Sequence, residues 1–242
     1  DQPFNVALFK EMAEEALAAI RARGRWPLVV GGTGLYVRVL LDDFGLTQTA
    51  ADPRLREALE AEIASRGAPA LHARLAAVDP QAAARIHPND RVRIVRALEV
   101  YKRTGVGISA HQAEDARRRR PKSAYRFALT ARREELYRRI DARVDAMLAA
   151  GLEEEVRTLF ARGLGPMLPP MRSLGYKEMC AYLCGECSLE EAVHAIKQST
   201  RRFAKRQLTW FRAERNLIWI DVSEISPEQA AHVILSHLTI SR

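Results

Sequence analysis

The sequence of 242 residues predicts an α/β fold in which a parallel, helix-covered sheet is interrupted by an all-α insertion. Residues 27–30 (PLVV) form a short apolar run between two helical patterns, as expected of a buried strand in such a sheet. Residues 125–130 (YRFALT) and 216–222 (NLIWIDV) have the same strand character. No convincing strand occurs between about residues 51 and 124. We therefore divide the chain into a first core part at 1–47, a helical insertion at 48–124 and a second core part at 125–242.

The first core part is predicted to be a helix, a strand and a second helix. Apolar residues recur on one helical face over residues 5–23, and Gly24 ends the pattern. The strand at 27–30 follows, and the next helix covers 34–41.

The insertion contains three predicted helices. The first begins at DPRLR, where Asp52 is the N-cap and a proline takes the first helical position. APALHARLAAV forms the second, and PNDRVRIVRALEVYKRTG forms the third with Asn89 or Asp90 as its cap. The run ARRRRPK at 116–122 is predicted to be an exposed, mobile loop.

The second core part is predicted to hold several helices between its two strands. A long helix ends at Gly151, a shorter one follows, and a proline-rich loop covers 164–171. RSLGYKEM then opens another helix. Ser188 and Glu191 form a capping-box pattern at the start of a long amphipathic helix.

The charge balance favours an anionic partner. Lys and Arg exceed Asp and Glu by 38 to 30, which gives a net charge of +8 and a pI near 9.7. Such a domain is a candidate for binding nucleic acid or phosphorylated substrates, although arginine-rich proteins without an RNA partner also exist. No apolar run is long enough to span a membrane and no signal peptide opens the chain, so we expect a cytoplasmic protein.

Three cysteines lie close together, at Cys180, Cys184 and Cys187. Their spacing resembles a metal site, but no further His or Cys lies at zinc-finger distance. We interpret them as small, half-buried residues on a helix and its exit turn, and we predict no metal ligand in this chain. The absence of a disulfide framework fits a reducing cytosol.

The stretch GGTGLY follows the predicted strand at 27–30 and opens the next helix. Backbone amides at Gly31 and Gly32 could approach a phosphate closely, and Thr33 adds a hydroxyl at the helix N-terminus. The phosphate loop with its lysine, GxxxxGK[ST], is absent from the chain. A tight turn that needs glycine for its backbone shape explains the stretch equally well.

Two arginine pairs on helices are further candidates for phosphate contact. Arg93 and Arg96 lie three residues apart, although Arg96 could instead pair with Glu99 on a solvated face. Arg139 and Arg143 lie four residues apart, where a mid-helix arginine could neutralise a pyrophosphate. The competing interpretation is ordinary ion pairing with nearby acids, Asp141 and Asp145.

Two later segments combine cations with aromatic residues. In MRSLGYKE, Tyr176 could stack on an unpaired base while Arg172 and Lys177 hold phosphates. TRRFAKRQLTWFR is dense in cations, and no acid occurs between Lys197 and Arg212. Such density is unfavourable by self-repulsion unless phosphates lie against it, so we predict phosphate or RNA contact at Arg201, Arg202, Lys205, Arg206 and Arg212.

Six motifs in this order resemble the tRNA dimethylallyltransferase (tRNA isopentenyltransferase) family: VVGGTGLYV, ADPRLR, ARIHPNDRVRIVRALEVY, MLAAGLEEEV, RSLGYKE and TRRFAKRQLTWFR. The resemblance implies a P-loop-kinase-like parallel sheet core with an all-α insertion domain. It implies transfer of a dimethylallyl group from dimethylallyl diphosphate to N6 of the adenine 3′ to the tRNA anticodon. It also implies Mg²⁺ as the cofactor and tRNA as the partner. Nothing in the sequence demands an oligomer, so we expect a monomer.

The same resemblance assigns roles to residues. Thr33 lies at the reaction centre between the diphosphate and the base, Gly31 and Gly32 cradle the diphosphate, and Arg143 matches the pyrophosphate-binding arginine. The positions that match tRNA contacts are Arg56, Arg93, Arg96, Arg172, Ser173, Leu174, Gly175, Tyr176 and Lys177, and we add Arg202 and Arg206 from their charge.

The chain departs from the family pattern at its start. The phosphate loop and a DS-x-Q-[VL]-Y-like segment, whose Asp is the general base, are absent, and Asp42, Asp43 and Asp52 do not lie in that motif. We therefore expect an N-terminally truncated chain that binds tRNA but is inactive or impaired alone. A small-molecule kinase with a helical lid and a non-catalytic RNA-binding module are the alternatives.

Overall fold

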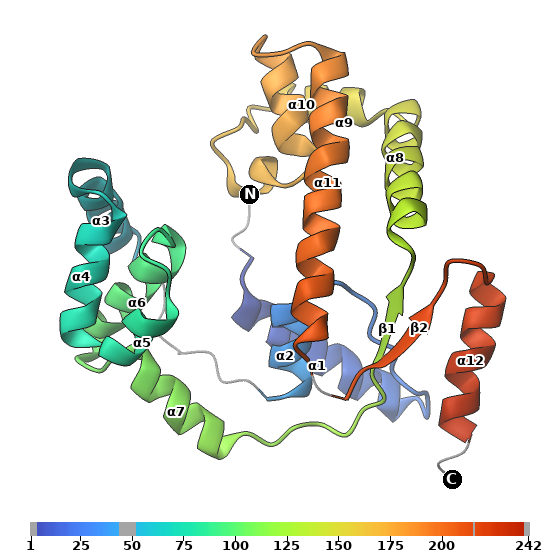
Figure 1. Cartoon of the computed structure of the whole chain (residues 1–242), viewed down its shortest axis with the longest axis horizontal. Coiled ribbons are helices and arrows are strands. Elements are labelled where there is room, and N and C mark those ends of the chain that lie inside the picture. The colour runs from blue at the N-terminus through green and yellow to red at the C-terminus, as the bar shows by residue number, and fades with distance from the viewer. Residues whose placement is uncertain (1–3, 44–51, 215, 240–242) are drawn as a thin grey trace. The chain divides into compact units, whose positions relative to one another are not determined.

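The computed structural model describes residues 4–43, 52–214 and 216–239, and it is mostly helical with a small parallel sheet (Figure 1). The chain divides into two compact units, Asp1–Ala124 and Tyr125–Arg242. Each unit has its own hydrophobic core.

Unit one begins with the two helices that flank the glycine-rich turn. Helix α1 (Val6–Ala22) starts at Asn5, whose side chain accepts hydrogen bonds from the first backbone N–H groups of the helix. Helix α2 (Gly34–Leu41) packs against it, and the rings of Phe9 and Tyr36 stack with their centroids 4.1 Å apart. Both predicted helices are confirmed.

The predicted buried strand at 27–30 is wrong. The structure assigns no strand there, and the side chains of Leu28 and Val30 are 83% and 85% exposed. In the described part of the chain, the sheet consists of two strands that both belong to unit two. An apolar, β-branched run favours a strand only when a neighbouring strand completes its hydrogen bonds, and the described residues offer this run none.

The described residues of unit one contain five further helices: α3 (Pro53–Arg66), α4 (Ala68–Val78), α5 (Pro80–Arg85), α6 (Arg91–Thr104) and α7 (Ile108–Arg118). They enclose a core that includes Leu59, Leu71, Leu75, Ile94 and Leu98. The side chain of Asp52 caps α3 through the N–H of Leu55, as predicted. Asp90 rather than Asn89 caps α6.

The predicted loop at 116–122 is wrong in its first three residues, because α7 continues to Arg118. Ion pairs one turn apart support this end of the helix, with Glu114 pairing Arg118 at 2.7 Å and Asp115 pairing Arg119 at 3.0 Å. Beyond the helix, Lys122 donates its N–H to the carbonyl of Leu41.

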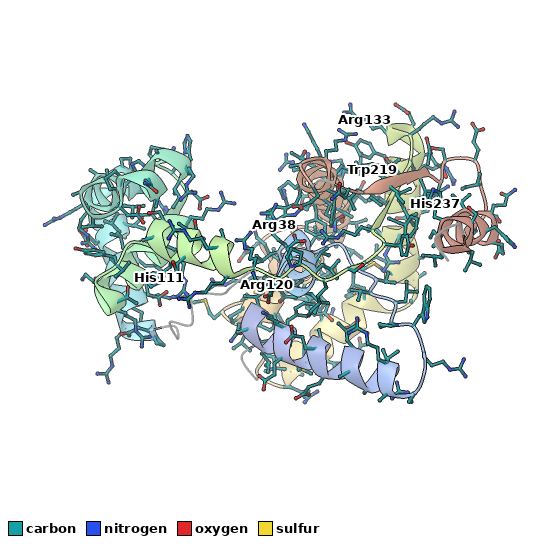
Figure 2. The ribbon with its side chains drawn as sticks, turned by 90° about the horizontal axis from the view of Figure 1, so that it is seen from below. Arg38, His111, Arg120, Arg133, Trp219 and His237 are labelled. Carbon is teal, nitrogen blue, oxygen red and sulfur yellow. The ribbon has the colours of Figure 1, made fainter. Side chains whose placement is uncertain are left out.

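Unit two is built around a parallel pair of strands, β1 (Phe127–Thr130) and β2 (Ile218–Asp221), in the register Phe127↔Ile218 to Thr130↔Asp221. Both predicted strands are confirmed. Helix α12 (Pro227–Thr239), which we did not predict, brings the ring of His237 edge-on to Phe127 at 5.7 Å (Figure 2).

The helices that follow β1 and precede β2 in the sequence are all predicted: α8 (Arg133–Ala149), α9 (Leu152–Ala161), α10 (Tyr176–Leu183) and α11 (Leu189–Arg212). The proline-rich loop contains a short 3-10 turn, η1 (Pro169–Arg172). Gly151 ends α8 with a φ of 97°, a conformation that favours glycine. Ser188 and Glu191 form the expected reciprocal capping box. The core of this unit includes Val144, Val156, Met171, Met179 and Ile196.

Candidate functional site

The glycine-rich turn exposes Thr33 at the start of α2. The carbonyl of Thr33 accepts the N–H groups of Tyr36 and Val37, whereas its side chain makes no capping hydrogen bond. At Gly31 the φ angle is not positive, and a Cβ would have no neighbour within 4 Å among the described residues. Neither the backbone shape nor the packing of the described residues therefore requires glycine at position 31, so the tight turn does not explain this glycine, and the phosphate role stays a prediction.

Arg143 is exposed on α8, and the acids that could have neutralised it are engaged with α11. Asp141 lies 3.2 Å from the guanidinium of Arg201, and Asp145 lies 2.6 Å from the ammonium of Lys197. Arg143 itself has no hydrogen bond or ion pair among the described residues. Ordinary pairing with its neighbours in sequence, the competing interpretation, is therefore not what the structure shows.

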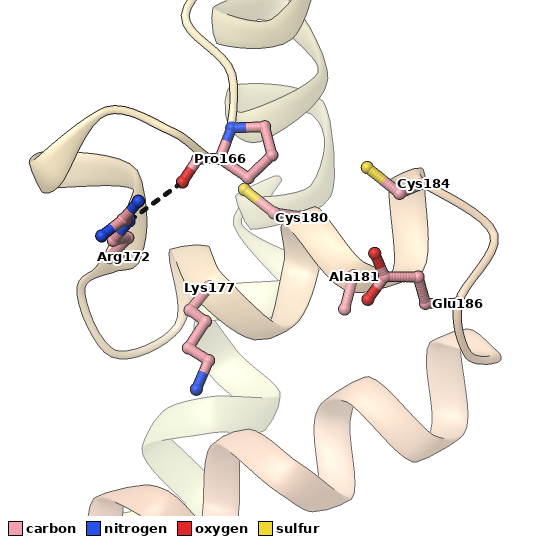
Figure 3. A pocket seen from close by; sticks show the side chains of 7 residues that line it. All are labelled: Pro166, Arg172, Lys177, Cys180, Ala181, Cys184 and Glu186. Atoms are coloured by element: carbon pink, nitrogen blue, oxygen red, sulfur yellow. Dashed lines mark hydrogen bonds between the residues drawn. The ribbon is translucent and has the colours of Figure 1, made fainter. Parts of the chain in front are cut away.

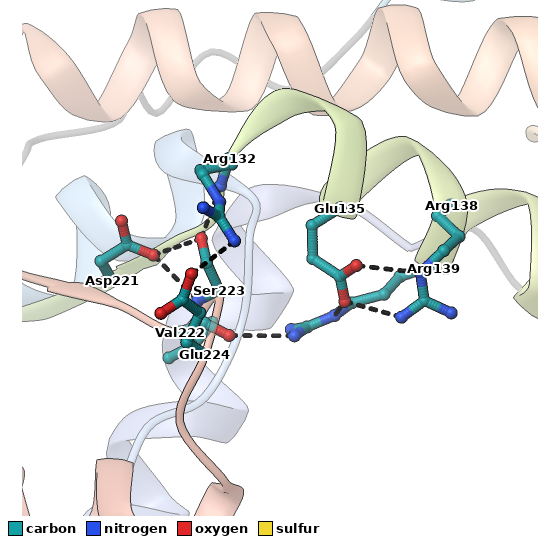
Figure 4. A network of polar contacts seen from close by, with 8 residues as sticks. All are labelled: Arg132, Glu135, Arg138, Arg139, Asp221, Val222, Ser223 and Glu224. Atoms are coloured by element: carbon teal, nitrogen blue, oxygen red, sulfur yellow. Dashed lines mark hydrogen bonds and ion pairs between the residues drawn. The ribbon is translucent and has the colours of Figure 1, made fainter.

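Arg139, one turn earlier, is engaged in a polar network at the end of β2 (Figure 4). Its guanidinium donates to Glu135 at 2.6 Å and to the carbonyl of Val222 at 2.9 Å. Hydrogen bonds from Arg138 and Arg139 lower the pKa of Glu135 to about 2. Of the arginine pair on α8, Arg139 thus ties α8 to the sheet and Arg143 stays available.

A buried carboxylate, Glu99, organises two of the predicted tRNA-binding arginines in unit one. It accepts two hydrogen bonds from Arg56 of α3, at 3.0 and 3.1 Å, and one from Arg96 of its own helix at 2.7 Å. The N–H of Asp52 adds a fourth at 2.9 Å. Burial alone would raise the pKa of Glu99, but these hydrogen bonds outweigh it and lower the pKa to about 2.

Arg93 differs from this pair because its side chain is 65% exposed and lies 3.5 Å from Asp90. The pairing of Arg96 with Glu99, considered from sequence as the alternative to RNA contact, is present. That Glu99 also holds Arg56 is not predicted from the sequence. A charged residue inside a buried run of α6 was the available signal.

In the segment RSLGYKE, backbone shape and packing account for part of the motif. Gly175 has a φ of 93°, which favours glycine, and its N–H donates to Glu178 at 2.9 Å. The hydroxyl of Tyr176 donates to Glu155, and the ring packs against the core of unit two. That hydrogen bond and burial raise the pKa of Tyr176. The predicted stacking of Tyr176 on a base stays a prediction, and it requires this ring to leave or extend its present packing.

A depression of about 400 Å³ lies beside the same segment (Figure 3). Arg172 and Lys177 stand at one end of it, and Cys184 and Glu186 stand at the other. Arg172 makes a long contact, 3.4 Å, with the carbonyl of Pro166. Ser173 and Leu174 are exposed in the turn before α10. The structure therefore brings the predicted cations of this segment to one open hollow.

The three cysteines of this region are all free thiols. Cys180 is buried and lines the hollow, and burial raises the pKa of its thiol. Cys184 is exposed and Cys187 is intermediate. In the ranges that the structure describes, no group of three His, Cys, Asp or Glu residues is placed to hold a metal ion.

On α11 the predicted cations divide into two sets. Arg201 pairs with an acid of α8, as does Lys197, which is not among the predicted contacts. The α11 stripe, defined as Arg202, Lys205, Arg206 and Arg212, is exposed and has no acidic partner among the described residues. Helical spacing places these four on one face, where a shallow groove of about 270 Å³ is lined by Lys205, Arg206, Thr209 and Trp210.

No helix in the described ranges is both long and apolar enough to cross a membrane.

Comparison with known families and structures gives a consistent result. A sequence model of the family described as IPP transferase matches residues 1–214. The tRNA dimethylallyltransferase of Desulforudis audaxviator is 48% identical over 240 residues, covering 98% of this chain and 76% of that protein. That of Moorella thermoacetica is 48% identical over 239 residues, covering 99% and 74%.

Solved structures are similar as well. The tRNA isopentenylpyrophosphate transferase of Bacillus halodurans superposes with a TM-score of 0.67 at 40% identity, covering 98% of this chain and 74% of that one. A eukaryotic dimethylallyltransferase acting on tRNA gives 0.76 at 25% identity, covering 100% and 63%. The chain thus spans about three quarters of the bacterial relatives.

Proposed function

This chain belongs to the IPP transferase family, and we propose that it transfers a dimethylallyl group from dimethylallyl diphosphate to N6 of the adenine 3′ to a tRNA anticodon. The fold is the predicted P-loop-kinase-like α/β class of that family. The observation that carries the proposal is 48% identity, over nearly the whole chain, to enzymes named tRNA dimethylallyltransferase.

The reaction breaks the C–O bond between the allylic carbon and the diphosphate and forms a bond from that carbon to N6. N6 loses one proton, and diphosphate leaves with the bonding electrons. Negative charge therefore grows on the leaving group, where fixed donors lower the barrier most. We propose the exposed Thr33 hydroxyl and the N-terminus of α2 as such donors, because that hydroxyl is not consumed by capping.

Arg143 is the proposed counter-charge for the diphosphate. Among the described residues it has no ion-pair partner, because Asp141 and Asp145 are engaged with α11. A guanidinium matches two phosphate oxygens at once, which suits this role better than a lysine.

The acceptor of the N6 proton is not assigned to the aspartates near α2 and α3. Asp43 accepts a hydrogen bond from Lys10 at 3.0 Å and one from the N–H of Arg120. Asp52 caps α3. By family resemblance, this role belongs to an Asp of the DS-x-Q-[VL]-Y-like segment, which the sequence does not contain.

We also propose Mg²⁺ as the cofactor. Because the described residues offer no cluster of acids, it would be held by diphosphate oxygens and water. When bound, it would neutralise charge on the leaving diphosphate.

Binding of the 242-residue chain to two anticodon stem-loops tests the proposal. One carries adenine 3′ of the anticodon and the other guanine, so that they differ only at the reacting base. We expect tighter binding to the adenine form. Equal binding to the two stem-loops would favour the alternative of an RNA-binding module that contacts only phosphates. Failure to bind either stem-loop would favour the small-molecule kinase alternative. Sedimentation of the same sample tests our proposal of a monomer, and localisation of a tagged chain tests our proposal that it is cytoplasmic.

A further inference from the structure

We infer that Glu99 is a positioning residue for tRNA binding, which holds Arg56 beside Arg96 so that the outer N–H groups of Arg56 meet an RNA phosphate. The inference rests on the proposed function, because it takes tRNA as the partner. Glu99 does not touch RNA in this scheme and acts through Arg56.

The hydrogen bonds of Glu99 fix both arginines at one point. Its Oε1 accepts from the N–H of Asp52 and from Nε of Arg56, and its Oε2 accepts from Nη2 of Arg56 and Nη1 of Arg96. The carboxylate is fully buried, so water does not compete for it. The two guanidiniums, which come from α3 and α6, are therefore held beside each other by a single acid.

Both arginines still reach the surface. The side chains of Arg56 and Arg96 are 43% and 31% exposed. Arg56 gives Glu99 two of its five N–H bonds and has no other partner among the described residues. The outer N–H groups of Arg56 are thus available to an anion.

A fixed arginine binds a phosphate at lower entropic cost than a free one. A long charged side chain loses about 1.5–2 kcal/mol of rotamer freedom when it is ordered. Arg56 has lost this freedom in the folded protein, before RNA arrives, whereas the exposed Arg93 must lose it on binding. Preorganisation of this kind is a function beyond holding α3 and α6 together.

Two variants that remove the same charge separate positioning from electrostatics. Glu99→Gln and Asp90→Asn each remove one negative charge at α6, and Asn is as good an N-cap as Asp. If only charge matters, both variants bind tRNA more tightly. If Glu99 positions the arginines, Glu99→Gln weakens binding about tenfold, the size of one good contact, while Asp90→Asn does not weaken it.

The measurement is the affinity of the 242-residue chain for the adenine stem-loop across a salt series, together with thermal unfolding of each variant. For folded Glu99→Gln we expect the slope of log K against log salt to be shallower by about 1, as when one phosphate is no longer bound. A purely structural role would leave the slope of the folded protein unchanged. If Glu99→Gln does not fold, Arg56→Lys decides, because lysine keeps the charge but not the two-pronged bond to Glu99.

Weaker binding by Arg56→Lys supports the inference, and unchanged binding by it overturns the inference. Folded Glu99→Gln that binds as tightly as Asp90→Asn also overturns it, while the proposed function stands. If the unsubstituted chain does not bind the stem-loop at all, the proposed function fails first and the inference fails with it.

Discussion

Helices α6 and α11 are both rich in arginine, yet their cations are balanced in different ways. On α6 a buried acid of the same helix, Glu99, holds Arg96 and also reaches Arg56 on α3. On α11 the acids come from another helix, α8, and serve only Lys197 and Arg201. The α11 stripe is left without acidic partners among the described residues. The number of cations on a helix therefore does not show which of them are held in place, which are paired with an acid and which have no acidic partner. Residues on other helices determine this.

The first prediction, which has the largest expected effect, tests the α11 stripe, whose cations have no acidic partner among the described residues. Replacing all four residues of the α11 stripe by Gln should weaken tRNA binding about a hundredfold or more at low salt, because fewer phosphates are neutralised and fewer counterions are released. The salt dependence should become shallower by about 0.7 to 0.9 for each phosphate that the variant no longer neutralises. Titration of the stem-loop against the variant at several salt concentrations measures both quantities.

The matched control removes the same charge from exposed cations of unit one with no predicted contact, at Arg21, Arg23, Arg25 and Arg66. It should lower affinity only slightly through net charge. Equal weakening in the two quadruple variants would mean that α11 acts through the overall field and not by touching the RNA.

The second prediction tests Glu99, which holds the arginines of α3 and α6, through the dependence of the free energy of unfolding on pH. The pKa of Glu99 falls from 4.5 to about 2 on folding, so its contribution to stability is present above pH 4.5 and is lost as the pH falls towards 2. The shift corresponds to about 3 kcal/mol at neutral pH. Denaturant unfolding at several pH values should show the gap between the wild-type chain and Glu99→Gln closing from about pH 5 to about pH 2. A gap that stays constant with pH would show that the charge of Glu99 is not what stabilises unit one.

The contrast between α6 and α11 also shows where sequence reasoning stops. The lack of acids between Lys197 and Arg212 is visible in the sequence, and it indicates the cations of the α11 stripe. The engagement of Lys197 and Arg201 is not visible, because their partners lie on another helix, α8. Glu99 is a recognisable partner for Arg96 at i+3, but its contact with Arg56 depends on how α3 packs against α6.

The same limit applies to the fold. Helices with clear periodicity or caps, such as α1, α3 and α11, and the strands β1 and β2 were predicted because their signals are local. The run at 27–30 has equally strong local signals, but a strand requires a partner that local signals do not supply. Among the site residues, the exposure of Thr33 and Arg143 agrees with the roles predicted for them, and those roles stay predictions.

The third prediction concerns Arg143 on α8, whose neighbouring acids pair with cations of α11. In a transfer-active form of the enzyme, Arg143→Ala should lower dimethylallyl transfer about a hundredfold, the usual cost of one donor to a developing anion. Affinity for tRNA should change far less. Arg139→Ala is the control on the same helix, since Arg139 is engaged with Glu135 and Val222. The measurements are the single-turnover rate and the stem-loop affinity of both variants. An equal decrease of the transfer rate and of the affinity in Arg143→Ala would contradict the assignment of Arg143 to the diphosphate.

The smallest expected effect comes from converting a neutralised cation of α11 into a free one. Asp145 pairs with Lys197 at 2.6 Å but is itself largely exposed, and such surface pairs contribute about 0–1 kcal/mol to stability. Asp145→Asn should therefore leave the unfolding midpoint nearly unchanged, yet release the ammonium of Lys197, which precedes the α11 stripe on the same helix. If that stripe binds phosphates, the released charge should tighten stem-loop binding about twofold to threefold at low salt, and the gain should disappear at high salt. A gain in affinity that persists at high salt would indicate that the substitution changes the conformation of the protein. No gain in affinity at low salt would mean that the bound RNA lies beyond the reach of Lys197. The contact would then be confined to the second half of α11.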